Sequence, residues 1–399
     1  MSRHHEPGFM TGLSLLLPIT LSTMAIVLLA PVLPGLLGEF SHVPDYEYWV
    51  PMVLTVPALC VALFSPVAGI LGDWFGRRRL LLWSFVIYAI VGIAPVFLTD
   101  IKAIIASRVA VGLAESLIMV LTTTMIGDYY QGAARDRWLA AQTAVASMSA
   151  IVFFNVGGLL GRAGWRAPFW VYGSALVMLL LVLLFTWEPS EKDAGDEAEV
   201  PPHHGSWAGF PWARMAGIIV VTVFGSVLFY TVQIQAPLGL VALGITDPAK
   251  TGFLTSLASI GVVVGTVIYS RVGRMQVSRL LLSEFGLLTV GFLLMSRAES
   301  PLPFLIGCFI NQLGAGMLLP TLLVWAMSSL PFEIRGRGAG MWTGAFSVGQ
   351  FLCPLVVTFA NKQVGGLLGA FGVLSGAALI GAMIALAGNL RRREVPVHG

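Results

Sequence analysis

The chain has 399 residues, of which 57% are hydrophobic and only 11% are charged, and its formal net charge is +3. Soluble domains carry about 25% charged residues, so a soluble protein of this length would have too little polar surface to cover itself. The composition therefore predicts an integral membrane protein. The basic residues form no patch interleaved with aromatic side chains, so we expect no nucleic-acid partner.

The apolar residues fall into windows of the length that a spanning helix needs, about 20 residues. Ten windows hold no Asp, Glu, Lys or Arg, and two more are interrupted by isolated charges. The sequence thus predicts an all-α integral membrane protein with twelve transmembrane helices, the first of them retained. The uncharged windows are Pro7–Gly38, Val50–Gly72, Leu80–Thr99, Trp138–Gly161, Ala167–Trp187, Met215–Thr246, Thr251–Ser270, Pro301–Phe332, Gly338–Asn361 and Gln363–Leu390, and the interrupted ones are Ala103–Gly127 and Leu280–Ser296.

The basic residues predict the orientation of these spans. Lys and Arg concentrate in the cytoplasmic loops of membrane proteins. With twelve spans and an inside N-terminus, well over half of the 23 basic residues fall in inside loops and tails. Both termini are therefore predicted to be cytoplasmic, and the compact loops favour a bacterial inner membrane.

One polar segment divides the chain into two halves of six spans. It starts at Glu188, reads EPSEKDAGDEAEVPPHHGSWAG, and has the acidic, Pro- and Gly-containing composition of a flexible linker. We expect an N-terminal bundle over residues 1–188, a cytoplasmic linker over 189–213 and a C-terminal bundle over 214–399. ARDRW recurs as IRGRG at an offset of 200, and DWFGR recurs as SRVGR at an offset of 197. The near-equal offsets indicate duplicated halves, a known transporter design.

The loop GILGDWFGRRRLL, which joins the second and third spans, concentrates charge and glycine in one short connection. It resembles the signature loop of the major facilitator superfamily, although Trp74 stands where the family usually has Arg. The resemblance implies a major facilitator fold and a cytoplasmic gate at this loop. The gate residues would be Gly69, Asp73, Gly76, Arg77, Arg78 and Asp128.

Physical chemistry gives these residues a role in holding the two halves together. An inside Asp73 can meet the positive N-terminal end of a neighbouring helix, which the resemblance implies is span eleven, near residues 336–340. Arg77 can pair with Asp128 at the inner end of span four. Exposed pairs contribute only about 0–1 kcal/mol, which suits a reversible latch. The alternative is that the arginines only hold the loop on the cytoplasmic side of the membrane. This alternative explains the arginines, but it does not explain Asp73 or the spacing of the glycines.

Two further stretches resemble the same family: SRVAVGLAES in span four and VGGLLGRAGWRAPFW at the junction of spans five and six. The layout resembles the branch that exchanges drugs for protons. That branch often carries a Gly-Pro pair four residues before the paired glycines of span five. Here Phe153 and Phe154 precede Gly157 and Gly158, so the chain departs from the branch at this motif.

Arg108 and Glu115 lie within span four, where charges cost about 2.5–3.5 kcal/mol on insertion scales and tend to mark pathways for ions or substrates. They are seven residues apart, which is about 10.5 Å along one helix face. We expect both to face a central cavity. Glu115 would be the proton-coupling carboxylate, and Arg108 its partner or an anchor for an anionic substrate. A structural polar cluster is the alternative.

Other polar residues within spans are weaker candidates for the same cavity, because a single one is more often a hydrogen-bonding contact between helices. As a set around one cavity they become plausible. They are Tyr230, Gln233, Gln235, Asn155, Asn311 and Gln312. Glu284 lies near the inner end of span nine, and we expect it to reach the membrane interface. Cys60, Cys308 and Cys353 are expected to be buried thiols.

The leading hypothesis is a proton-coupled exporter of hydrophobic or amphipathic small molecules that works by alternating access. One alternative is a proton symporter for an organic anion anchored by Arg108. A remote alternative is a non-transporting membrane receptor or assembly factor. The sequence has no nucleotide loop, metal-ligand spacing or nucleophile-base set, so we expect no enzyme activity, no metal and no cofactor beyond a proton gradient. The expected partners are a small-molecule substrate and the lipid bilayer, and the chain is expected to act as a monomer.

Overall fold

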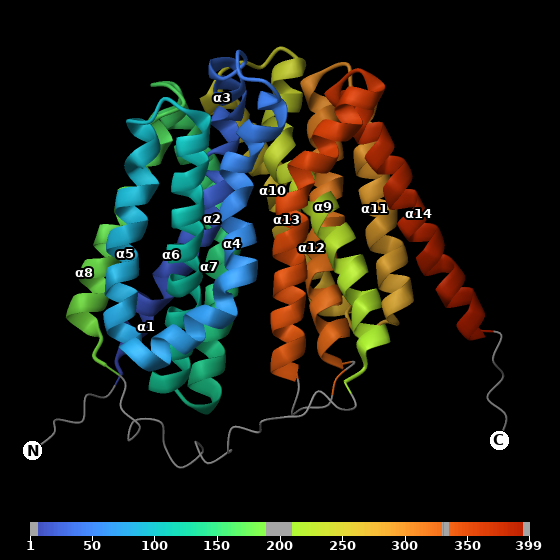
Figure 1. Cartoon of the computed structure of the whole chain (residues 1–399). Helices are drawn as coiled ribbons and strands as arrows, with labels where there is room; N and C mark the ends of the chain where they lie inside the picture. The colour runs from blue at the N-terminus through green and yellow to red at the C-terminus, as the bar shows by residue number, and fades with distance from the viewer. Residues whose placement is uncertain (1–6, 189–209, 329, 331–334, 394–399) are drawn as a thin grey trace, which may run out of the picture.

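The computed structural model describes residues 7–188, 210–328, 330 and 335–393 (Figure 1). They contain 12 helical segments that are long and apolar enough to cross a membrane, which confirms the all-α, twelve-span prediction. The N-terminal half holds α1 (Phe9–Leu16), α2 (Thr20–Val27), α3 (Leu33–Glu39), α4 (Tyr46–Phe75), α5 (Arg77–Ile93), α6 (Ile101–Tyr129), α7 (Gly132–Gly161) and α8 (Ser174–Phe185). The C-terminal half holds α9 (Trp212–Ala242), α10 (Pro248–Val272), α11 (Val277–Ser296), α12 (Pro301–Ser328), α13 (Arg335–Val364) and α14 (Leu367–Arg393).

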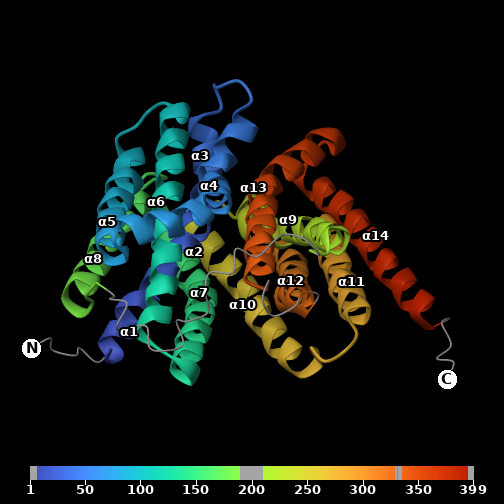
Figure 2. The ribbon, with the colours of Figure 1, turned by 60° about the horizontal axis from the view of Figure 1, so that its bottom comes forward.

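The helices form two bundles, α1–α8 and α9–α14, which stand side by side (Figures 1 and 2). The start of α1 and the end of α14 lie at the same end of the molecule, with the turn that carries Arg77–Arg79. We call this end the basic face and the other end the far face. Of the predicted linker 189–213, residues 189–209 lie outside the described part of the chain, and α9 begins at Trp212.

The first span, Phe9–Glu39, is interrupted because it contains prolines. A proline has no backbone N–H and clashes with the preceding turn, so it breaks regular helix hydrogen bonding. Pro18 lies in a short 3₁₀ turn at Leu17–Ile19, and Pro31 lies in another at Ala30–Val32. The span therefore consists of α1, α2 and α3 in sequence, all within one membrane crossing.

The far face is where the two bundles are joined. Arg162, which follows the last residue of α7, pairs with Asp247, which directly precedes α10, at 2.6 Å. Lys362 of α13 pairs with Glu47 of α4 at 2.7 Å, and the Thr358 hydroxyl donates to the Glu47 carbonyl at 3.2 Å. These contacts between the bundles close the structure at the far face.

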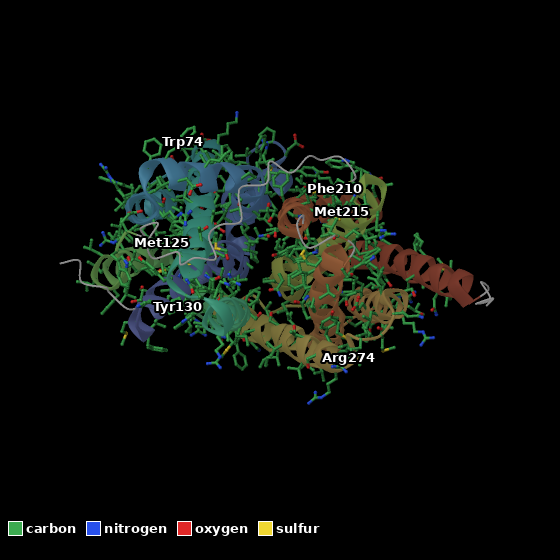
Figure 3. All side chains as sticks on the ribbon, turned by 90° about the horizontal axis from the view of Figure 1, so that it is seen from below. Trp74, Met125, Tyr130, Phe210, Met215 and Arg274 are labelled. Carbon is green, nitrogen blue, oxygen red and sulfur yellow. The ribbon has the colours of Figure 1, made fainter. Side chains whose placement is uncertain are left out.

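Seen from the basic face, Met125 and Tyr130 of one bundle and Phe210 and Met215 of the other lie on opposite sides of a central space (Figure 3).

Backbone packing of α7 against α10 closes the far face further. A Cβ atom on Gly252 would lie 2.3 Å from the Phe154 carbonyl oxygen, and one on Gly158 would lie 2.5 Å from the Pro248 carbonyl oxygen. Real Cβ atoms do not approach so closely, so both positions require glycine in this conformation. Small residues let membrane helices approach in this way. Gly158 is one of the paired glycines noted in span five.

The Arg162–Asp247 pair sets the pH range over which the far face stays closed. The hydrogen bond from Arg162 lowers the pKa of the Asp247 carboxyl below its ordinary value. A lowered folded-state pKa stabilises the paired form above the ordinary carboxyl pKa of about 3.9, and this stabilisation is lost as pH falls through the lowered value. We therefore expect far-face closure to be unchanged between about pH 8 and about pH 5.

Thiol labelling can measure this closure. Val32, which is 2% exposed, lies at the far-face junction and is replaced by cysteine in a background without Cys60, Cys308 and Cys353. Because the thiolate is the reacting species, its labelling rate is divided at each pH by that of an exposed reference cysteine. This ratio should be flat over this pH range, and Asp247→Asn should raise it at every pH. A rise in labelling between pH 8 and pH 5 that Asp247→Asn removes would contradict the assignment.

Candidate functional site

The signature loop forms a compact ionic cluster at the basic face. Gly76 joins α4 to α5 with φ of 86°, a conformation that favours glycine. Arg77 then pairs with Asp73 at 2.9 Å and with Asp128 of α6 at 2.5 Å, so the predicted contact to span four is present. The Asp73 side chain is 62% exposed. Its predicted contact with the start of span eleven was placed at residues 336–340, of which the side chains of 336 and 337 lie outside the described residues.

Glu188 holds the same turn from span six, and the sequence reasoning missed it. Its two carboxylate oxygens accept the backbone N–H groups of Arg78 and Arg79 at 3.2 and 3.3 Å. These are free donors of the first turn of α5, so the carboxylate caps that helix. The Arg78 guanidinium donates to the Leu183 carbonyl at 2.9 Å. The feature of the sequence that could have predicted this contact is the position of Glu188 directly after the sixth apolar window.

A cavity of about 310 Å³ lies between the two bundles at mid-span depth. Both bundles contribute four spans to its wall, as expected for a central site between duplicated halves. The lining residues are Ser22, Thr23, Ile26, Val27, Ala58, Val61, Glu115, Met119, Ala146, Ser147 and Ala150 from the N-terminal bundle, and Phe229, Tyr230, Gln233, Ser259, Val262, Leu319, Thr343, Phe346, Ser347 and Gln350 from the C-terminal bundle.

Glu115 is the one charged side chain among the described residues that line this cavity. It is 4% exposed, and its Oε2 atom has no hydrogen-bond partner. Tyr230 lines the opposite wall and lies close enough to interact electrostatically with Glu115. A buried carboxyl with an unfilled acceptor can take up a proton or the polar group of a bound molecule.

Arg108 lies outside the cavity, which differs from the expectation that it would face the cavity with Glu115. It is 0% exposed, and its guanidinium lies 4.6 Å from the ring centre of Tyr172 and 5.3 Å from that of Phe169. One nitrogen donates to the Gly92 carbonyl at 3.2 Å. The two charges share a helix face, but α5 and span six pack over α6 at the depth of Arg108. It still lies within electrostatic range of Glu115.

An aromatic cluster forms the wall that faces Glu115. The rings of Tyr230 and Phe346 are centred 5.4 Å apart, and Phe229 lies 4.8 Å from Tyr230. Trp342 stacks on Phe346 with ring centres 5.5 Å apart and an interplanar angle of 13°. Such a wall can hold a planar apolar group by stacking. The cavity thus combines one acidic side with one aromatic side.

Gln233 lines the cavity as predicted and is held in place from behind. Its Nε2 donates to the Gln312 Oε1 at 2.6 Å, while its own Oε1 has no partner. The Gln312 Nε2 reaches the Asn311 Oδ1 at 3.3 Å and the Phe229 carbonyl at 3.4 Å. Asn311 and Gln312 are therefore supporting residues and do not line the cavity, where the sequence placed them.

Two other cavity candidates are also located elsewhere. Gln235 is 3% exposed but points away, because it lies two positions after Gln233 on the same helix. Asn155 donates to the Ile151 carbonyl of its own helix at 2.8 Å. Thr343, Ser347 and Gln350 line the cavity and were missed. Their spacing of four and three residues marks one helix face, and this polar stripe in an apolar span was the available signal.

Glu284 does not reach the membrane interface, so that prediction is wrong. It is 0% exposed and accepts a hydrogen bond from the Thr321 hydroxyl at 2.5 Å. The side chain turns inward because α12 packs against α11 there, where a Cβ on Gly314 would lie 2.9 Å from the Glu284 carbonyl oxygen. Glu284 is not a lining residue of the central cavity.

Comparison with known proteins identifies the family. The model of the Major Facilitator Superfamily matches residues 15–354 and 243–398. The chain belongs to the major facilitator superfamily. The tetracycline resistance protein, class C, of Escherichia coli is 31% identical over 216 residues, which cover 53% of this chain and 52% of that protein. The 3-(3-hydroxy-phenyl)propionate transporter of Escherichia coli (strain K12) is 25% identical over 331 residues, 80% of this chain and 74% of that protein.

A solved structure shares the fold of this superfamily member over nearly its whole length. It is a bacterial homologue of the human lysosomal transporter Spinster in an inward-facing and unoccupied conformation. Its TM-score is 0.77 at 16% sequence identity, with 97% of this chain and 96% of that chain covered. The chain is therefore a multi-pass membrane transporter with the major facilitator fold, and it is similar over half of its length to drug-resistance members of the superfamily.

Proposed function

We propose that this transporter exports hydrophobic or amphipathic small molecules in exchange for protons, by alternating access. The observation that carries the proposal is Glu115, the single charged side chain among the described residues of the central cavity. A proton and a cationic substrate compete for one carboxylate, and this competition is sufficient to couple their movements in opposite directions. The aromatic wall of Tyr230, Phe346 and Phe229 suits the apolar part of such a substrate.

The arrangement of the two bundles supports an alternating-access cycle. The far face is closed by two ion pairs and by glycine packing, and all of these contacts are between bundles. Both ion pairs are exposed to solvent, and exposed pairs add little stability, so the closure is reversible. In the opposite state, we propose that the signature loop closes the basic face through Asp73, Arg77 and Asp128.

Symport of an organic anion is the second candidate, and the similarity to an aromatic-acid transporter favours it. In that case an anion would need a cationic anchor. Arg108 is the candidate, yet Phe169 and Tyr172 stand beside its guanidinium and it does not line the cavity. We therefore rank symport second and use Arg108→Ala to test it.

The distribution of Lys and Arg supports a proposal for the orientation of the protein in the membrane. We propose that the basic face is cytoplasmic, with both termini on that side, because loops rich in Lys and Arg stay inside. The protein would then act as a monomer in a bacterial inner membrane. A proton gradient would supply the energy, with no cofactor. Limited proteolysis from each side of oriented vesicles tests the orientation.

Transport in proteoliposomes under an imposed pH gradient tests the function. Tetraphenylphosphonium and ethidium serve as cationic probes, and benzoate serves as an aromatic acid. The proposal expects the cations, and not the acid, to drive proton release. A signal from benzoate alone that Arg108→Ala abolishes would replace export by symport.

The support of Gln233 by Gln312 predicts a selective effect on substrate binding. Gln312→Leu removes the acceptor of the Gln233 amide, and a buried unsatisfied group costs about 1–3 kcal/mol. We expect the KM for a transported cation to rise about tenfold, with a smaller change in maximal rate. Gln312→Asn keeps a neutral amide acceptor at this position and should give a KM closer to that of the wild type. Equal KM values for the Leu and Asn variants would show that Gln312 does not position Gln233.

A further inference from the structure

The C-terminal bundle contains a buried acid that the proposed function does not use. Glu284 of α11 is 0% exposed, and Thr321 of α12 is its one hydrogen-bond partner within the described residues. The second carboxyl oxygen, Oε2, has no partner. No Lys or Arg lies within ion-pair distance of Glu284 in the described part of the chain, whereas Glu115 has Arg108 in electrostatic range.

The surroundings of Glu284 contain few groups that could fix its charge. Along α12, the only titratable side chain is Cys308, near the other end of the helix. Along α14, which also packs on α11, the charged residues are Arg391–Arg393, whose side chains lie outside the described residues. Tyr269, in the last turns of α10, lies within electrostatic range and is partly exposed at the basic face.

Thr321 can serve Glu284 in either protonation state. Its hydroxyl lies 2.5 Å from the Glu284 Oε1 and 3.1 Å from the Met317 carbonyl of its own helix, and it has a single proton to donate. When Glu284 is ionised, the hydroxyl donates to the carboxylate. When the carboxyl has bound a proton, its O–H donates to the Thr321 oxygen, and the hydroxyl proton turns to Met317. An arginine partner would hold only the ionised form.

We propose that Glu284 is a second proton-binding site, paired with Thr321 and separate from the central cavity. A proton from water at the basic face adds to the carboxylate to give the neutral acid, and its release restores the carboxylate, so no other reactant is needed. This proton can bind in the absence of substrate. Its use in coupling rests on the proposed function.

The position of Thr321 in α12 connects this site to the cavity. Thr321 follows Pro320, which interrupts the hydrogen bonding of α12, and the nearby Gly316 carbonyl accepts the Thr266 hydroxyl at 3.2 Å. Leu319, one position before the proline, lines the cavity. A change of charge at Glu284 thus acts on the helix segment that also forms a wall of the central site.

Infrared difference spectroscopy of the protein in liposomes tests the proposal without a substrate, because a protonated carboxyl and a carboxylate absorb at different frequencies. The proton is the ligand, and pH is varied between about 5 and about 9. We compare the wild type with Glu115→Gln, Glu284→Gln and the double variant. We expect a titrating carboxyl band that persists in Glu115→Gln and is lost in Glu284→Gln. Glu299→Gln, at an exposed position after α11, is the matched control and should leave this band unchanged.

Thr321 variants separate a proton site from a structural contact. Thr321→Val removes the hydroxyl and should shift the titration midpoint of the Glu284 band, and Thr321→Ser should restore it. A band that does not titrate over this range, or that Glu284→Gln does not remove, would overturn the proposal, whatever the thermal stability of the variant. Absence of proton-coupled transport in the wild type would refute the proposed function and leave this spectroscopic result intact.

Discussion

Replacing Glu115 by Gln should abolish the coupling between proton and substrate movement. The amide keeps the size of the side chain but can neither release a proton nor neutralise a cation. In the wild type, tetraphenylphosphonium should bind more tightly as pH rises, because the proton competes for the same carboxylate. In Glu115→Gln, binding should be weaker by about 5–150-fold, a coupling of about 1–3 kcal/mol, and should not depend on pH.

The measurement is equilibrium binding over a pH series, together with proton release in proteoliposomes. Glu115→Asp is the matched variant, since it keeps the charge and moves it back by one methylene, and it should retain pH-dependent binding. Normal proton-coupled transport by Glu115→Gln would show that Glu115 is a structural residue. The proposed exporter mechanism would then lose its central site.

Replacing Gly252 by Val should disrupt closure of the far face and thereby stop the transport cycle. The added Cβ would meet the Phe154 carbonyl at 2.3 Å and the Gly158 Cα at 3.1 Å, and these backbone atoms cannot rotate away. Overpacking costs about 1–3 kcal/mol, enough to change the ratio of two conformations about 5–150-fold. We expect transport to fall about tenfold or more, because the conformation that is closed at the far face is disfavoured.

Labelling of cysteine at Val32, on the other bundle, reports the change directly and should become faster in Gly252→Val. Gly217→Val is the control, because Gly217 lies within a helix and a Cβ there would meet nothing within 4 Å. Both variants exchange helical glycine for valine, so an effect of propensity alone would appear in both. Equal labelling in the two variants would show that α7–α10 contact does not control the far face.

The fold could be predicted from sequence because hydrophobic length and loop charge are local properties of the chain. Twelve apolar windows gave twelve spans, and the signature loop gave the family. The Arg77–Asp128 contact was also predictable, since both residues occupy fixed places at the inner ends of adjacent spans. Pro18 and Pro31 indicated the interruptions of the first span. The apolar windows were chosen for their lack of charged residues, and that criterion takes no account of proline.

The candidate site was harder to predict because it depends on how helices rotate about their axes. Glu115 and Gln233 were found as polar residues in apolar spans, and both line the cavity. Arg108 shares a helix face with Glu115, yet neighbouring helices pack over one position and leave the other open. Glu284 was misplaced for a related reason, because only the packing of α12 on α11 turns its side chain inward.

The contact between Glu188 and the start of α5 determines where the two halves could be separated in the laboratory. Expression of the bundles as two polypeptides is a direct way to ask whether each folds alone. A cut before Glu188 would remove the carboxylate that receives the Arg78 and Arg79 amides, and would leave the first turn of α5 with free donors. The cleavage point or inserted fusion partner therefore belongs after residue 188, so that the N-terminal polypeptide ends with its own cap.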